Sequence, residues 1–159
     1  MSTVSLELAV PAYDRLLLDT SALITYLNGG ELVTPGIAEI LDSFVRTGRN
    51  QAIVAMVTVM ESLVRPLRLG AGEPYRHVLD FLTRFPNLRT VDIDLPIGQE
   101  AAAIRASFHL AAPDALVVAT GTIAHVGHLV TNDHKWSNRL QTVQRRIQVV
   151  ELKAHLPFP

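Results

Sequence analysis

The sequence of 159 residues contains no cysteine, which excludes disulfide bonds and thiolate metal sites and permits a reducing cytosol. Net charge is also nearly absent. Its formal value of −1 gives no global basic field that would attract a nucleic acid, although a local basic patch would still do so. No apolar stretch reaches the roughly 20 residues that span a bilayer, and residues 1–11 lack the basic and apolar regions of a signal peptide. We therefore expect a soluble, cytoplasmic protein without a membrane partner.

Apolar strands that alternate with helices make up the rest of the sequence. Hydrophobic residues account for 48% of it, which is enough for a substantial core in one domain spanning residues 1–159. Unbroken apolar runs predict buried strands at 15–19 and 52–57, and further strands are predicted at 88–93, 128–131 and 147–152. Apolar residues three and four apart predict helices at 20–28, 35–47, 58–68, 73–85, 96–110, 113–127 and 135–140. This alternation predicts a three-layer α/β domain with a mostly parallel sheet.

Two local features qualify this pattern. Residues 1–14 are interrupted by Pro11 and are expected to form a short irregular lead-in. Pro66 lies inside a predicted helix, where its missing N–H and its ring should kink the helix or end it early.

Three carboxylates stand alone within apolar sequence. Asp19, Glu61 and Asp114 are the only formal charges within 16–30, 50–64 and 106–132, respectively. Burying such a carboxylate is unfavourable unless a cation or hydrogen-bond donors accompany it. Glu61 is followed four residues later by Arg65, a spacing that allows an ordinary helical ion pair. Asp19 and Asp114 have no such neighbour, so their partner is expected to be a divalent metal or an arginine distant in sequence.

Each acid also has a purely structural explanation, because each is expected near the start of a helix. Asp19 and Asp133 are suited to capping the helices that follow them. The segment from Thr58 to Glu61 matches a capping box, in which the glutamate ties down the first helical turn. Asp114 would be a first-turn acid favoured by the helix dipole. For any one of these acids alone, the capping role is the commoner one.

The shared position of the four acids favours a site. In a parallel sheet, the carboxyl ends of the strands meet at one edge, where ligands of α/β proteins bind. Asp19, Glu61 and Asp133 follow strands, and Asp114 joins them if its helix begins at that edge. Clustered acids repel one another unless cations compensate, and Mg²⁺ or Mn²⁺ prefers oxygen ligands. Two such ions about 4 Å apart would activate water and stabilise the leaving oxygen in phosphodiester hydrolysis.

These residues resemble the four acidic motifs of PIN-domain ribonucleases. The motifs are found here in the same order, at Leu17–Leu23, Thr58–Glu61, Pro113–Thr120 and Leu129–Asp133. The successive acids are 42, 53 and 19 residues apart, which suits a compact single-domain member. Within the family, the sequence is most similar to the VapC toxins of bacterial and archaeal toxin–antitoxin pairs.

The resemblance implies a three-layer α/β/α fold with a five-stranded sheet and the Asp19 strand at its centre. It implies an endoribonuclease that depends on Mg²⁺ or Mn²⁺ and acts on RNA. It also implies a homodimer that is neutralised by a small antitoxin. Carried over by position, the catalytic, metal-binding acids would be Asp19, Glu61, Asp114 and Asp133.

Further polar positions and two departures follow from the same resemblance. Thr20 or Ser21 would supply a secondary hydroxyl near the metal, and Thr131 and Asn132 occupy the polar positions beside the last acid. Trp136 stands where members of the family often have phenylalanine, and it is interpreted as an equivalent packing residue. Lys135 stands where some members place a further acid, which bears on the number of metal ions.

Two other functions remain open from the sequence. In the first, Asp19 would be the phosphate-accepting nucleophile of an aspartyl-phosphate enzyme. The strand of such enzymes ends in the motif Asp-x-Asp, whereas here Ser21 stands in place of the second acid. Alternatively, the chain would be a non-catalytic RNA- or protein-binding module.

The basic residues proposed to line the crevice and meet RNA phosphates are Arg65, Arg68, Lys135, Arg139, Arg145 and Arg146.

Overall fold

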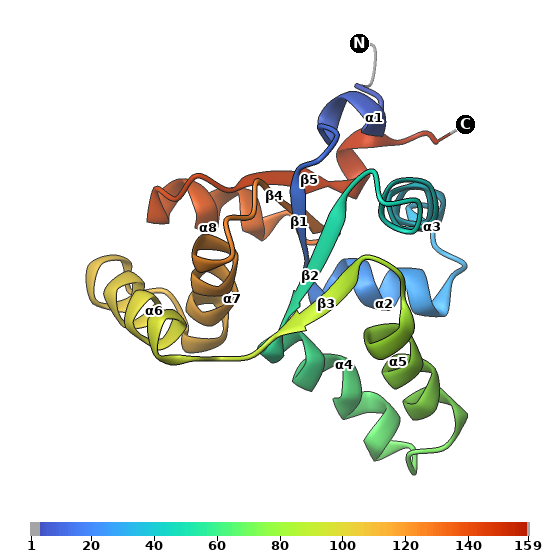
Figure 1. Cartoon of the computed structure of the whole chain (residues 1–159), viewed down its shortest axis with the longest axis horizontal. Coiled ribbons are helices and arrows are strands. Elements are labelled where there is room, and N and C mark those ends of the chain that lie inside the picture. Colours follow the sequence, from blue (N-terminus) through green and yellow to red (C-terminus); the bar gives the residue numbers. More distant parts are fainter. Residues whose placement is uncertain (1–3, 159) are drawn as a thin grey trace.

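Five parallel strands form the centre of the computed structural model, which describes residues 4–158. The strands are β1 (Arg15–Leu18), β2 (Gln51–Ala55), β3 (Leu88–Val91), β4 (His128–Thr131) and β5 (Gln148–Glu151). Their order in the sheet is β3-β2-β1-β4-β5, and every neighbouring pair is parallel. The expected five-stranded sheet with the Asp19 strand at its centre is therefore confirmed (Figure 1).

Helices cover both faces of this sheet. They are α1 (Leu6–Ala9), α2 (Thr20–Asn28), α3 (Thr34–Ala38), α4 (Met56–Arg68), α5 (Glu73–Arg84), α6 (Leu95–Phe108), α7 (Ala112–Ile123) and α8 (Lys135–Val143). A π-helical segment, η1 (Glu39–Val45), continues α3, and a 3-10 turn, η2 (Leu152–His155), follows β5. In Figure 1, α6, α7 and α8 lie to the left of the sheet, and α2, α3 and α5 lie to its right. Within residues 4–158, no helix combines the length and apolar character needed to cross a membrane.

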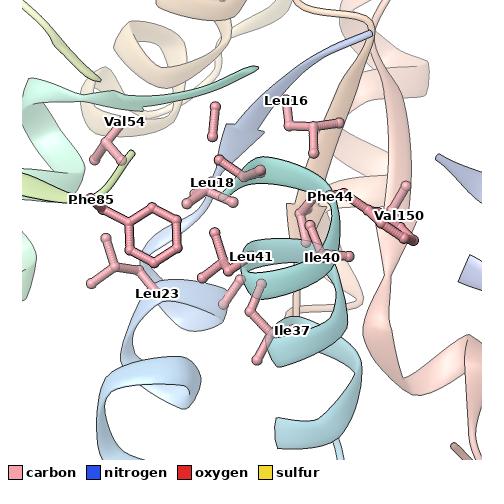
Figure 2. Close-up of a cluster of buried hydrophobic side chains, with 14 of the residues drawn as sticks. Leu16, Leu18, Leu23, Ile37, Ile40, Leu41, Phe44, Val54, Phe85 and Val150 are labelled. Carbon is pink, nitrogen blue, oxygen red and sulfur yellow. The ribbon is translucent and has the colours of Figure 1, made fainter. Parts of the chain in front are cut away.

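The unbroken apolar run of β1 is explained by burial on both faces. Successive side chains of a strand point to opposite faces. Leu16 and Leu18 accordingly pack into one core together with α2, η1 and α5. Figure 2 shows Leu16 and Leu18 beside Leu23 of α2 and Ile40, Leu41 and Phe44 of η1. Leu17 packs into the other core with α6, α7 and α8. All three side chains are fully buried. A strand covered by helices on both sides needs no polar alternation.

Two predicted segments differ from the structure in the first core. The lead-in is not wholly irregular, because α1 buries Leu6, and Val10 beyond it is also buried, against this core. The helix expected over 35–47 widens after Ala38 into the π-helical turns of η1, where the amide of Arg46 donates to the carbonyl of Leu41 at 2.8 Å. Four residues of η1 are buried, so tertiary packing accompanies this wider turn.

The α4 helix starts earlier than predicted. It begins at Met56, directly after β2, rather than at Thr58. It ends at Arg68, as predicted, and it continues through Pro66, so the expectation that this proline would end the helix early is wrong.

The order of the strands places the site. The chain builds β1, β2 and β3 outward in one direction and then returns to the other side of β1 to form β4 and β5. Ligands of open α/β sheets bind outside the carboxyl ends of the strands at such a switch point. Leu18 is in register with Val130, and the amide of Asp19 donates to the carbonyl of Val130 at 3.0 Å. The residues after β1 and those after β4 therefore lie side by side.

Candidate active site

Asp19 immediately follows the central strand and is almost fully buried. It occupies the residue before α2, but its carboxylate makes no capping hydrogen bond, so the capping interpretation is wrong for this side chain. Instead, Oδ2 accepts hydrogen bonds from Ser21 Oγ at 2.8 Å and from Thr131 Oγ1 at 2.9 Å. The side chain is only 7% exposed. These two hydroxyls provide donors that a buried carboxylate requires.

The same hydroxyls join the end of β1 to the end of β4. Ser21 Oγ lies 3.1 Å from Thr131 Oγ1 and accepts a hydrogen bond from the amide of Asn132 at 2.9 Å. Thr131 Oγ1 also accepts from the amide of Asp133 at 2.9 Å. The expected polar neighbours Ser21, Thr131 and Asn132 thus form one network that positions Asp19 and Asp133.

Glu61 reaches the cleft from the second turn of α4, since that helix begins at Met56. The capping-box interpretation is therefore wrong. Its carboxylate accepts a short hydrogen bond from the hydroxyl of Thr20, the first residue of α2. Arg65 makes no ion pair with Glu61 in the described part of the chain and lines a separate groove between α2, α4 and α5.

Asp114 and Asp133 share one basic partner, Arg139 of α8. Arg139 Nε lies 3.2 Å from Asp114 Oδ2, and Arg139 Nη1 lies 3.4 Å from Asp133 Oδ2. Asp114 is in the first turn of α7, as predicted. Asp133 Oδ1 accepts from the amide of Lys135 at 3.0 Å, so this acid does tie down the start of α8. Trp136 is 3% exposed and packs in the second core, in agreement with its interpretation as a packing residue.

One cleft of about 510 Å³ brings all four predicted acids together. Its lining is Asp19, Thr20, Ser21, Ile24, Thr25, Glu31, Val57, Glu61, Pro113, Asp114, Val117, Asn132, Asp133, Trp136 and Arg139. Glu31 is a fifth acid that sequence reasoning missed. It accepts from Thr25 Oγ1 at 3.0 Å and from Asn132 Nδ2 at 3.4 Å. Its only sequence signal is its place after Gly29 and Gly30, which end α2 with positive φ angles.

Arg139 is the one basic side chain among the described residues that line this cleft. The sequence proposed five others, and the structure does not place them there. Arg145 pairs with Glu100 at 2.6 Å and, with Arg146, lines a cavity beside Asp14 and Gly127. Gly127 precedes β4, so that cavity lies at the opposite edge of the sheet. The expected broad basic lining is therefore wrong.

The electrostatics of the cleft are most evident at Asp114. Burial raises the pKa of this carboxyl above its ordinary value, and the neighbouring charges of Asp19 and Asp133 raise it further. The Arg139 guanidinium opposes them by lowering the pKa, but it does not cancel the rise. The lining of the cleft contains five carboxylates and one arginine, so its side chains include more acids than its own arginine can neutralise.

The carboxylates of the cleft are ligands of the type that binds a hard divalent cation, although they do not converge on a single coordination point. Within residues 4–158, no three His, Asp or Glu side chains are close enough to hold a metal ion in their present positions. The acids are instead held by hydroxyls, as at Asp19 and Glu61, or by Arg139. Carboxylate oxygens are nevertheless the ligands that Mg²⁺ and Mn²⁺ prefer, and five carboxylates line this cleft with one arginine. The residues fit such an ion by chemistry.

The model of the PIN domain family matches residues 16–139, most of the chain and all four acids. The chain is a PIN-domain protein. A sequence search among curated proteins gives no match.

Solved structures of toxin–antitoxin proteins share this PIN-domain fold. FitAcB from Neisseria gonorrhoeae aligns with a TM-score of 0.65 at 20% identity, over 87% of this chain and 98% of that one. VapBC2 from Rickettsia felis, bound to a DNA fragment from its promoter, aligns with a TM-score of 0.65 at 15% identity, over 86% and 98%. The sarcin–ricin loop cleaving toxin VapC20 from Mycobacterium tuberculosis aligns with a TM-score of 0.62 at 12% identity, over 77% and 93%. The resemblance drawn from the sequence motifs is thereby confirmed.

Proposed function

We propose that this PIN-domain protein is a metal-dependent endoribonuclease and the toxin of a toxin–antitoxin pair. The observation that carries the proposal is the convergence of Asp19, Glu61, Asp114 and Asp133 on one cleft at the switch point of the sheet. The fold similarity to toxin proteins, one of which is described as cleaving the sarcin–ricin loop, supports the choice of RNA as the substrate.

The four acids would hold Mg²⁺ or Mn²⁺ as the cofactor. The bound metal would supply Lewis-acid stabilisation of phosphate oxygens and lower the pKa of water to generate the nucleophile. The chain's own residues orient the ligands. Ser21 and Thr131 hold Asp19, and Thr20 holds Glu61. Such outer partners fix the direction and basicity of metal ligands.

We also propose a protein partner, the cognate antitoxin, and a homodimer. The α4 helix exposes apolar side chains, with Met60 56%, Val64 36% and Leu67 52% exposed. Beside it, a groove of about 240 Å³ runs between α2, α4 and α5. Exposed apolar surface of this kind is suited to protein contacts. Light scattering tests the dimer, because one chain has a mass of 17.4 kDa and a dimer would have twice that mass.

Cleavage of a mixed set of structured and unstructured RNAs tests the enzymatic proposal. The wild type and Asp19→Asn are compared with Mg²⁺, with Mn²⁺ and with EDTA. Cleavage should require the metal and fall by about 100-fold or more in the variant, since a lost ligand costs at least as much as a lost outer partner. Asp80→Asn, which removes an exposed acid of α5 paired with Arg84, is the matched control and should keep full activity. A folded wild type that neither cleaves RNA nor binds Mn²⁺ would instead indicate the non-catalytic module.

A further inference from the structure

Arg139 bridges two of the four acids that are proposed to hold the metal. Its guanidinium reaches Asp114 with Nε at 3.2 Å and Asp133 with Nη1 at 3.4 Å. A planar guanidinium can engage two carboxylates at once, which a lysine ammonium does less well because it is a compact point charge. The bridged oxygens are Oδ2 of Asp114 and Oδ2 of Asp133, so one oxygen of each acid already has a cationic partner.

The surroundings of Arg139 hold the guanidinium in this position. The guanidinium carbon lies 5.0 Å from the centre of the Trp136 ring, close enough for a cation–π contact. Trp136 is 3% exposed and fixed in the second core, so it offers a rigid surface. The Arg139 side chain itself is 26% exposed. Its charge is therefore partly shielded from water, and no other basic side chain of the described residues lines the cleft.

We infer that Arg139 is the chain's own counter-ion for the metal-binding acids and competes with the divalent metal for Asp114 and Asp133. The inference rests on the proposed function, because it takes these acids as metal ligands. At Asp133 the guanidinium and a metal would compete for Oδ2, because Oδ1 accepts from the amide of Lys135, and at Asp114 the guanidinium takes one of the two oxygens. Arg139 also repels a nearby divalent ion by its charge alone. A metal held by both acids would therefore displace the guanidinium from Asp133.

This competition gives Arg139 effects of opposite sign on the two forms of the protein. Without metal, Arg139 stabilises the fold by neutralising two of the clustered acids. With metal, the same ion pairs must be broken, so they weaken metal binding. A residue that only packs on Trp136 would not produce this opposition, because its loss would destabilise the fold without strengthening metal binding.

Binding of Mn²⁺ alone to the full-length protein tests the inference, measured by electron paramagnetic resonance of the free ion and by calorimetry. We expect Arg139→Gln to bind Mn²⁺ about three- to tenfold more tightly than the wild type, the range expected for a partly exposed charge pair. In EDTA, the melting temperature of the same variant should fall. Arg145→Gln is the matched control. Arg145 has the same 26% exposure and pairs with Glu100 away from the cleft, so its loss should leave Mn²⁺ affinity unchanged.

The outcomes separate this inference from the proposed function. If the wild type binds Mn²⁺ and Arg139→Gln binds it equally or more weakly, the inference is wrong and the metal site stands. If neither protein binds Mn²⁺ or Mg²⁺, both the inference and the proposed metal dependence are wrong. Arg139→Lys keeps the test decisive if the glutamine variant does not fold. Its ammonium bridges the two acids less well, so its affinity should lie between those of the wild type and the glutamine variant, and an affinity no higher than wild type would overturn the inference.

Discussion

At the scale of single residues, structural and functional roles coincide in the same side chain. Asp133 ties down the first turn of α8 through Oδ1, while Oδ2 faces Arg139 across the cleft. Capping and metal binding were competing interpretations of this acid in the sequence, yet capping uses Oδ1 and leaves Oδ2 directed into the cleft. A carboxylate at a helix start is already directed toward the edge where ligands bind, so one role does not exclude the other.

The hydroxyl network beneath Asp19 leads to a first prediction. Ser21 Oγ donates to Asp19 and accepts from the amide of Asn132, so Ser21→Ala removes the partner of that amide and leaves Asp19 with one hydroxyl donor, Thr131. We expect Mn²⁺ affinity to fall by about tenfold, the lower end of the range for lost outer partners of a metal site. Calorimetric titration measures this. Thr142→Val, which removes a hydroxyl on the exposed side of α8, is the control and should bind as the wild type does. Unchanged affinity in Ser21→Ala would show that the network does not orient the ligand.

The raised pKa of Asp114 leads to a second prediction, on stability. A carboxyl whose pKa is raised by folding favours the protonated form in the folded state. Its contribution to stability is therefore present below the unfolded pKa and is lost as the pH rises through the folded pKa. At neutral pH, the ionised side chain is a net cost. Asp114→Asn should thus raise the melting temperature in EDTA by about 1–3 °C, a small change because water screens a side chain that is one quarter exposed.

Thermal unfolding from pH 3 to pH 7 without metal measures this effect. The difference between Asp114→Asn and the wild type should be smallest at acid pH and should grow through the range just above 3.8, the ordinary value of the carboxyl pKa. A variant that is less stable than the wild type at pH 7 would mean that the Arg139 ion pair outweighs burial. In either case the variant should lose RNA cleavage, because a ligand is missing.

At the scale of elements, the sequence predicts strands and acids better than helix starts. The strands β1 and β2 were found because burial on both faces leaves an unbroken apolar run, and Asp19, Glu61 and Asp133 because they follow strands. The start of α4 was missed because a capping motif at Thr58 indicated a later start, whereas the helix begins straight after β2. Thr58 is fully buried, and its hydroxyl has no partner within residues 4–158. Tertiary packing has overridden a local signal there.

The partners of the acids were also beyond prediction, for a different reason. Arg139 of α8 forms an ion pair with Asp114 of α7, and Glu31 accepts a hydrogen bond from Asn132, which is 101 residues further along the chain. Such pairs depend on side-chain directions after the helices have packed. A single sequence shows hydrophobic periodicity but does not show which distant side chains touch. Arg139 was therefore only one of six basic residues proposed to line the crevice.

The contact between α3 and the C-terminal segment leads to a third prediction. A Cβ added at Gly36 would lie 2.2 Å from the Phe158 ring, which packs against the first core. Gly36→Ala should therefore destabilise the fold by about 1–3 kcal/mol, the usual cost of overpacking. Gly98→Ala is the matched control in α6, where an added Cβ meets nothing within 4 Å. That variant should be more stable by up to about 1 kcal/mol, the helix preference of alanine over glycine. Urea denaturation distinguishes the two signs, and equal changes in both would refute the proposed clash.

At the scale of the whole molecule, the small net charge predicts how RNA binding responds to salt. The formal net charge is −1, and Arg139 is the single basic side chain lining the cleft in the described part of the chain. Each neutralised phosphate of a single strand contributes about −0.7 to the slope of log affinity against log salt. The slope of log(kcat/KM) against log[KCl] at constant Mg²⁺ should therefore be about −1. A slope steeper than about −3 would reveal an extended basic surface.

The central pairing of β1 with β4 also determines when the proposed active site is complete. Asp19 is hydrogen-bonded to Thr131, although 112 positions separate them along the chain. Proteins are synthesised from the amino terminus, so a growing chain holds Asp19 long before its strand partner and Asp133 exist. A premature stop codon, or a cut that removes the segment after α7, would leave an inert fragment. If the protein is the toxin proposed above, it would be inert until nearly all of its own translation is complete.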